Sequence, residues 1–237
     1  MKGTGLRLAM AAAIVLSARA GLAQNVVGGW EGDDTQGYLF LTPTAALSLS
    51  PSQSLLVRGT ASFLYYGSQL DGPTDVTAPG VSAMLGYRYA NRVVSTSVAG
   101  GYEGRRVRRI GAAGPGVTFE RGASFAGELF TNVSTLTQIN ALASYGEANR
   151  YSWLRLGAKR QLTNTRFTGS RAVSLGVEAT AQGNTDVTTY QLGGLYEIAW
   201  FGTRTSMQLR AGYSRSEFSS GAFQSKPYVG IGLYRGF

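Results

Sequence analysis

The sequence contains no histidine and no cysteine among its 237 residues. Without histidine, the chain cannot build a Ser-His-Asp triad, an Asp-His protease pair or a histidine-containing metal site. Without cysteine, it has no thiol nucleophile, no thiolate metal ligand and no disulfide. Carboxylate catalysis is compatible with the composition, but no acidic pair stands out at close spacing. We therefore expect a protein that is not an enzyme, with no catalytic residue, no cofactor and no metal.

Long apolar runs are also missing, because no segment after residue 24 approaches the roughly 18 consecutive apolar residues of a membrane helix. The first residues follow a different pattern: residues 1–7 carry two basic side chains, residues 8–16 are apolar, and small residues then allow cleavage after Ala20 or Ala23. This order is typical of a secretory signal peptide. We expect residues 1–23 to be cleaved and residues 24–237 to form one domain. Cleavage removes three basic residues and no acid, so the formal charge falls from +9 to +6.

What the mature region does contain is apolar–polar alternation with a period of two. In one example, Val173, Leu175 and Val177 alternate with Ser174 and Glu178. Such alternation predicts strands with one apolar and one polar face. Many segments run about 10–13 residues, which is longer than most soluble strands and close to the length of a tilted membrane strand. Aromatic residues gather near segment ends, as in interfacial girdles. The pattern predicts an all-β fold: a transmembrane antiparallel up-and-down β-barrel.

We expect about twelve strands, with ten to fourteen compatible with the pattern. The expected spans are residues 25–32, 37–49, 54–66, 80–90, 93–104, 117–130, 136–146, 150–161, 172–182, 187–200, 205–215 and 227–237. Without the first span the count would be odd, which bacterial single-chain barrels avoid. We expect short periplasmic turns at 50–53, 90–92 and 201–204, with a longer one at 163–171. Segments 67–79, 105–116 and 216–226 are expected to be extracellular loops.

The chain end carries an assembly signal. Val229, Ile231, Leu233 and the terminal Phe237 share one parity, with Arg235 as the departure. A last strand that ends in phenylalanine resembles the signature by which barrel-assembly machinery recognises outer-membrane proteins. We therefore expect the outer membrane of a Gram-negative bacterium as the location. The expected partners are the barrel-assembly machinery, membrane lipid and lipopolysaccharide, with no nucleic acid.

Strand parity also predicts which charged side chains line the lumen. These candidates are Arg58, Arg88, Glu103, Arg105, Glu128, Arg155, Glu178, Glu197 and Arg210, with Glu120 and Lys159 on the same parity. Either they pair across the lumen and close it, or they line a narrow channel for an anionic or sugar substrate. The densest basic cluster is Arg105, Arg106, Arg108 and Arg109. We expect it in an extracellular loop, where it is either solvated or meets lipopolysaccharide phosphates or an acidic polysaccharide.

The order of several short motifs resembles the cellulose biosynthesis protein BcsS family. The matching segments are Glu31-Gly32-Asp33-Asp34 with Gly37-Tyr38-Leu39-Phe40, Leu56-Val57-Arg58, Tyr65-Tyr66-Gly67, Leu85-Gly86-Tyr87, Gly100-Gly101-Tyr102-Glu103, Leu175-Gly176-Val177-Glu178, Gly183-Asn184 and Gly212-Tyr213. The chain has Gly176-Val177-Glu178 where a Gly-Pro-Glu step is expected. The resemblance implies a barrel that accompanies cellulose or exopolysaccharide synthesis and export. The alternatives are a general or oligosaccharide-selective porin and a non-conducting structural or adhesion barrel.

Overall fold

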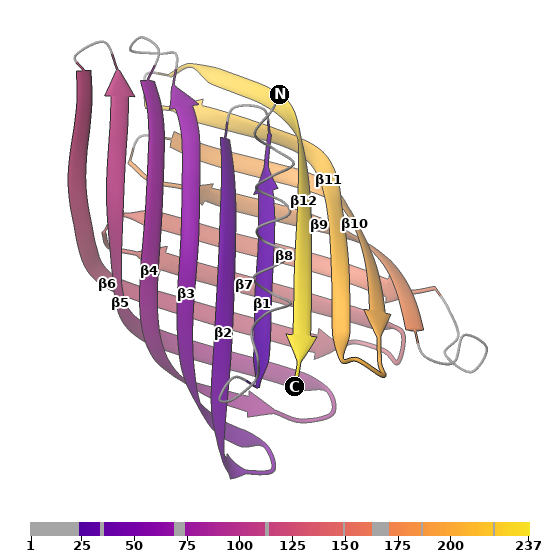
Figure 1. Cartoon of the computed structure of the whole chain (residues 1–237). Helices are drawn as coiled ribbons and strands as arrows, with labels where there is room; N and C mark the ends of the chain where they lie inside the picture. The colour runs from indigo at the N-terminus through magenta and orange to yellow at the C-terminus, as the bar shows by residue number, and fades with distance from the viewer. Residues whose placement is uncertain are drawn as a thin grey trace.

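The computed structural model describes residues 24–33, 36–68, 74–111, 114–148, 150–162, 171–185, 187–219 and 221–237. The expected signal peptide and most of the expected connection at 163–171 lie outside these residues. The described part contains twelve strands (Figure 1): β1 (Asn25–Gly32), β2 (Gln36–Ser50), β3 (Gln53–Ser68), β4 (Thr74–Ala90), β5 (Val94–Gly111), β6 (Gly114–Asn132), β7 (Thr137–Gly146), β8 (Tyr151–Gln161), β9 (Arg171–Gly183), β10 (Val187–Trp200), β11 (Thr205–Phe218) and β12 (Phe223–Gly236). No helix within the described ranges is long and apolar enough to cross a membrane.

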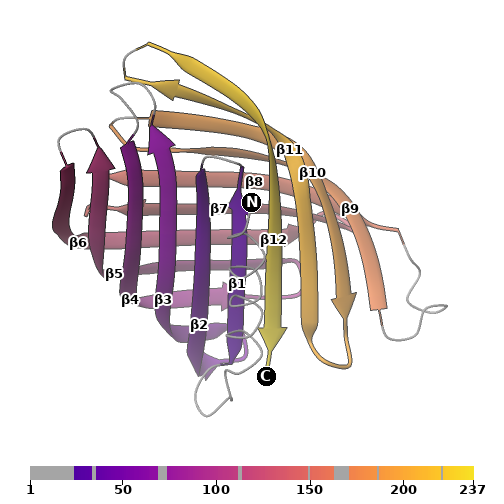
Figure 2. The ribbon, with the colours of Figure 1, turned by 45° about the horizontal axis from the view of Figure 1, so that its top comes forward.

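Each strand pairs antiparallel with its neighbours in the sequence, and β1 pairs with β12 to close the barrel (Figure 2). The closing register places Asn25 opposite Gly236 and Gly32 opposite Val229. The predicted all-β, antiparallel, up-and-down barrel of twelve strands is therefore confirmed, including the first strand at Asn25–Gly32. We call the end that holds Asn25 and Gly236 the terminal end, and the opposite end the far end.

The sheet places its polar side chains inside and its apolar ones outside. On β9, Val177 is 63% exposed, whereas Ser174, Glu178 and Thr180 are buried. This is the inverse of a soluble protein, in which charged side chains are almost never fully buried. The outward positions of the barrel carry exposed apolar side chains, among them Val57, Val81, Leu85, Val98, Leu156, Leu192, Tyr213 and Val229. A closed barrel with such an exterior satisfies its backbone in lipid without leaving a sheet edge.

One wall of the barrel is much taller than the other. Strands β4, β5 and β6 contain 17, 18 and 19 residues, whereas β7 and β8 contain 10 and 11. Figure 1 shows the β3–β4 and β5–β6 hairpins as the long upright pairs at the left. Since the apolar band of such barrels is only about 25 Å tall, the far ends of these hairpins rise beyond it.

The prediction of long loops at the far end was wrong. The segment 105–116, expected as a loop, continues β5 to Gly111 and enters β6 at Gly114. Likewise β4 begins at Thr74, and β11 extends to Phe218. The glycine, proline and arginine content of these segments suggested loops, but alternation continues through them: Val107 is buried between the exposed Arg106 and Arg108. Gly114, with φ of 95°, adopts a left-handed conformation that favours glycine at the tight hairpin.

Candidate functional site

A cluster of four buried charges lies in the barrel interior, and we call it the central network. It consists of Glu31 on β1, Arg155 on β8, Glu178 on β9 and Arg210 on β11. Arg155 Nη2 forms an ion pair with Glu31 Oε2, and its Nε lies 3.8 Å from Glu178 Oε2. Arg210 Nε lies 3.1 Å from Glu178 Oε2, and its Nη1 lies 3.9 Å from Glu31 Oε2. Each arginine therefore contacts both carboxylates.

The central network crosses the lumen. Four strands separate β1 from β8 in one direction around the barrel and six in the other. Side chains from such nearly opposite strands meet only by reaching across the interior. The ion pair between Glu31 and Arg155 is therefore a bridge from one wall to the other.

The charges of the network balance, as burial requires. The side chains of Glu31, Arg155 and Arg210 are 12%, 10% and 12% exposed, and that of Glu178 is 3% exposed. An unpaired charge in such surroundings is costly, whereas a paired and hydrogen-bonded one is tolerated. Two arginines and two glutamates leave no net charge in the cluster, so the arrangement is self-neutralising.

Neutral groups add hydrogen bonds to the network. The Tyr228 hydroxyl on β12 donates to Glu178 Oε1 at 3.3 Å, and Arg155 Nε donates to Thr180 Oγ1 at 3.3 Å. Glycine makes the position of Tyr228 possible: a Cβ on Gly193 would lie 2.3 Å from its hydroxyl oxygen, and one on Gly212 would lie 2.8 Å from its ring. Glycine at these two positions, on the neighbouring strands β10 and β11, therefore leaves room for the tyrosine side chain.

The network continues toward the terminal end through β8, β10 and β11. Arg210 Nη2 donates to Gln208 Oε1 at 2.5 Å, and Gln208 Nε2 donates to Glu197 Oε2. Lys159 Nζ lies 2.6 Å from Glu197 Oε1. Charged and amide groups thus form a continuous chain from Glu31 to Lys159.

Apolar packing occupies the interior beside the network on the tall wall. Val76, Ala78 and Val107 are buried in one cluster, against which Leu64 and Tyr66 pack. On β2, the rings of Tyr38 and Phe40 are stacked with centroids 5.7 Å apart. These side chains occupy the same parity as the lumen-facing residues of β2–β5. Apolar and aromatic side chains of β2–β5 therefore occupy the interior along the tall wall.

A separate ion pair, outside the central network, lies nearer the terminal end. Arg58 Nη2 on β3 contacts Glu128 Oε1 on β6 at 2.8 Å, and the Ser97 hydroxyl donates to Glu128 Oε2 at 3.0 Å. Arg88 Nη2 lies 3.5 Å from the Ser54 hydroxyl oxygen. This pair also links strands that are not neighbours, but it spans only β3 to β6.

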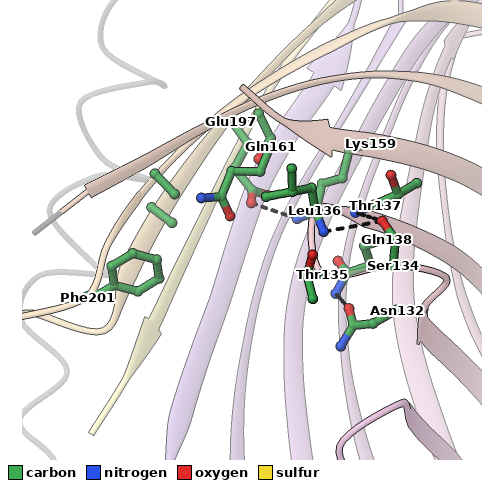
Figure 3. A pocket seen from close by; sticks show the side chains of 13 residues that line it. Asn132, Ser134, Thr135, Leu136, Thr137, Gln138, Lys159, Gln161, Glu197 and Phe201 are labelled. Carbon is green, nitrogen blue, oxygen red and sulfur yellow. Dashed lines mark hydrogen bonds and ion pairs between the residues drawn. The ribbon is translucent and has the colours of Figure 1, made fainter. Parts of the chain in front are cut away.

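A cavity of about 170 Å³ opens on the terminal side of the Lys159–Glu197 pair. Its lining is mostly hydroxyl and amide groups: Asn132, Ser134, Thr135, Thr137, Gln138, Gln161 and Ser174. Figure 3 shows Phe201 on one flank and the group from Asn132 to Gln138 on the other. Here Gln138 Nε2 donates to Asn132 Oδ1 at 3.3 Å. The cavity offers many donors and acceptors for a neutral, hydroxyl-rich molecule.

The structure places every lumen candidate from the sequence on the inward face. Arg155, Glu178, Glu197 and Arg210 join the network or its extension. Arg58 and Glu128 pair separately, Arg88 lies beside Ser54, and Arg105 Nη1 donates to the Ala78 carbonyl at 3.2 Å. The Glu103 carboxylate packs where a Cβ on Gly146 would be, at 2.3 Å. Sequence reasoning missed Glu31 and Tyr228 as network members, although strand parity gives both an inward direction.

The basic cluster divides between the two faces of β5. Arg105 and Arg109 point inward, and Arg109 Nη2 lies 3.4 Å from Glu120 Oε1. Arg106 and Arg108 point outward. The expected loop location of this cluster is thus corrected to a strand, for the reason given above. In the described ranges, no group of three or more acidic side chains gathers as a metal site.

Comparisons with known proteins show the fold. No protein-family description matches the sequence, and no curated protein does. The β-domain of the Bordetella autotransporter BrkA superposes with a TM-score of 0.54 at 12% identity, covering 91% of this chain and 100% of that one. The KdgM porin in complex with disordered oligogalacturonate gives 0.42 at 12% identity, covering 90% and 99%. A bacterial polysaccharide outer membrane secretin gives 0.41 at 12% identity, covering 91% and 98%. The chain therefore has a closed antiparallel barrel fold similar to that of the BrkA β-domain.

Proposed function

We propose that this chain is an outer-membrane barrel, closed at rest, that accompanies the biosynthesis and export of cellulose or another exopolysaccharide without catalysing a reaction. We infer the closed state from the ion pair between Glu31 on β1 and Arg155 on β8, which bridges the lumen. The apolar exterior and the barrel fold support the location in the outer membrane. The resemblance to the BcsS family supports the link to cellulose.

In this role the barrel anchors or organises export components, and its network keeps the membrane sealed. A self-neutralised, hydrogen-bonded cluster suits this task because it fills a polar lumen without leaving a buried charge unpaired. The barrel wall then presents its two ends to partners on either side of the membrane. The terminal cavity and the tall far wall are the features that differ most from a plain cylinder.

The test is cellulose output in a cellulose-producing bacterium that carries this chain. Deleting the gene is expected to lower secreted β-1,4-glucan, measured by dye binding, while synthase activity in isolated inner membranes is unchanged. Re-expression of the wild type restores secretion. Unchanged secretion after deletion contradicts the proposal.

A barrel cross-linked across its lumen distinguishes a role in anchoring export components from a role in conducting glucan. The chain has no cysteine, so Glu31→Cys with Arg155→Cys introduces the only two thiols, and a bifunctional thiol reagent joins them across the lumen. The locked barrel is expected to restore secretion as well as the untreated variant. Loss of secretion on cross-linking argues that glucan passes through the lumen.

The terminal cavity favours a second candidate function, an oligosaccharide-selective porin. Its hydroxyl and amide lining matches the hydrogen-bonding groups of a sugar. Under this alternative, proteoliposomes take up cello-oligosaccharides faster than unrelated sugars of the same length. Equal and negligible uptake of both leaves the closed barrel as the better account.

A further inference from the structure

The outer face of the β5–β6 hairpin carries three arginines near its far end. Arg106 and Arg108 point outward from β5, and Arg121 points outward from β6. In the register, Arg106 lies opposite Phe119 and Arg121 lies opposite Gly104, so Arg106 and Arg121 are diagonal neighbours. Long side chains reach one another at that spacing. We call these three residues the outer arginine patch.

Among the residues that the structure describes, none supplies a paired counter-charge to the outer arginine patch. All three residues are exposed, and none forms an ion pair with a described residue. The carboxylates of this hairpin, Glu103, Glu120 and Glu128, lie on the inward face. The outward Asp75 on β4 lies opposite Ile110, beyond the arginines, and forms no ion pair with them. The three guanidinium groups on these adjacent strands therefore have no ion-pair partner among the described residues and can bind an external anion.

The height of the patch along the barrel matches lipid headgroups. The outward face of β5 carries Val98 and then Tyr102, both exposed. Arg106 and Arg108 occupy the second and third outward positions beyond Tyr102. Tyrosine in such barrels marks the interface between the apolar band and the headgroups. The next outward side chains along the strand therefore lie at the level of the headgroup phosphates.

The outward position between the arginines carries no side chain. A Cβ on Gly104 would meet no atom within 4 Å. Gly104 lies between Tyr102 and Arg106 on β5 and opposite Arg121 on β6. The exposed ring of Phe119, at 78%, lies directly opposite Arg106 and adds an apolar surface. This part of the outer face therefore combines guanidinium groups with exposed aromatic surface beside them.

We propose that the outer arginine patch binds the phosphates of lipid A in lipopolysaccharide. Guanidinium groups bind phosphate oxygens in bidentate geometry, and the aromatic rings contact the adjoining acyl chains. The proposal rests on the proposed outer-membrane location, with the chain termini on the periplasmic side. The patch then faces the outer leaflet, where lipid A is the phosphorylated lipid.

The test uses the full mature barrel refolded in detergent and titrated with fluorescent lipid A. The triple variant Arg106→Ala, Arg108→Ala, Arg121→Ala is expected to bind roughly a hundredfold more weakly than the wild type. Each basic residue near a charged lipid surface contributes about fivefold in affinity, and three such factors multiply. The matched control is Arg215→Ala, which also removes an outward arginine near the far end. Arg215 is already neutralised by Glu217, with Nε to Oε1 at 3.1 Å, so its loss leaves binding unchanged.

Ligand controls identify the source of the phosphate. Dephosphorylated lipid A is expected to bind the wild type as weakly as lipid A binds the triple variant. Phosphatidylglycerol is expected to bind at least about tenfold more weakly than lipid A. Equal affinity for phosphatidylglycerol, or displacement by inorganic phosphate at millimolar concentration, overturns the proposal.

Folding is checked by heat-modifiable gel mobility before each titration. If the triple variant does not refold, the three arginines are replaced by lysine, which keeps the charge and removes the bidentate geometry. Binding equal to the wild type in either variant overturns the proposal. These outcomes are independent of cellulose secretion, so failure here and failure of the proposed function are distinguishable.

Discussion

Removing one carboxylate from the central network should be far more damaging than removing one from the barrel exterior. Glu178→Gln preserves the shape of the side chain and deletes its charge. Arg155 and Arg210 then share only Glu31, and the Tyr228 hydroxyl loses a charged acceptor. The perturbation therefore leaves one buried positive charge without a partner.

The magnitude follows from the burial. Glu178 is 3% exposed, and both arginines that face it are at most 12% exposed. Breaking a buried pair by removing one partner costs about 3–5 kcal/mol. The matched control, Glu217→Gln, breaks the pair with Arg215, whose side chains are 49% and 57% exposed. An exposed pair of this kind contributes about 0–1 kcal/mol.

The assay is urea unfolding of the mature barrel in lipid vesicles, followed by tryptophan fluorescence. We expect the free energy of unfolding to fall by about 3–5 kcal/mol for Glu178→Gln and by less than about 1 kcal/mol for Glu217→Gln. Adding Arg210→Met to Glu178→Leu should cost less than the sum of the two single changes, because the orphaned charge is removed with its partner. Equal losses for Glu178→Gln and Glu217→Gln would refute the reasoning.

Three further predictions concern the walls and the chain end. Val177→Arg, on the lipid face near the middle of β9, should lower the free energy of unfolding by about 2–4 kcal/mol in the same urea titration. Ser144→Arg, at an exposed inward position of β7, should lower it much less. Gly193→Ala places a Cβ 2.3 Å from the Tyr228 hydroxyl and 2.6 Å from the Ala211 carbonyl oxygen, and it should lower the free energy of unfolding by about 1–3 kcal/mol. The control Gly194→Ala has its nearest atom at 4.0 Å and should leave the free energy of unfolding unchanged. Equal stability of the two variants would count against the packing described. Phe237→Ala should lower the fraction of heat-modifiable, assembled barrel in cells, while a Phe201→Ala control in a turn should not; unchanged assembly would remove Phe237 as the signal.

The period of two was enough to predict the barrel and the direction of its side chains. Each apolar position such as Val177 and each polar one such as Glu178 takes its face from parity alone, because successive residues of a strand alternate. These are local properties, so the sequence contains them directly. The prediction of the first strand, Asn25–Gly32, depended instead on the even strand count of bacterial barrels, and this strand carries Glu31 into the lumen.

The partners across the lumen were not predictable in the same way. Glu31 and Arg155 are separated by 124 positions, and their contact depends on how the closed sheet staggers its strands. The hairpins at the far end were wrongly predicted as loops for another reason. Residues 105–111 and 114–116 rise beyond the apolar band, so arginine, glycine and proline replace apolar residues there while the strands continue. Composition indicated a loop where backbone pairing with β6 maintains a hairpin.

The closed lumen is tested most directly by single-channel conductance in planar bilayers. The wild type is compared with a variant in which the central network is removed as a unit: Glu31→Ala, Arg155→Ala, Glu178→Ala and Arg210→Ala. Deleting all four leaves no unpaired charge and clears the bridge between β1 and β8. We predict that the folded wild type is silent and that the variant carries steady current. A wild type that conducts as well as the variant would contradict the account.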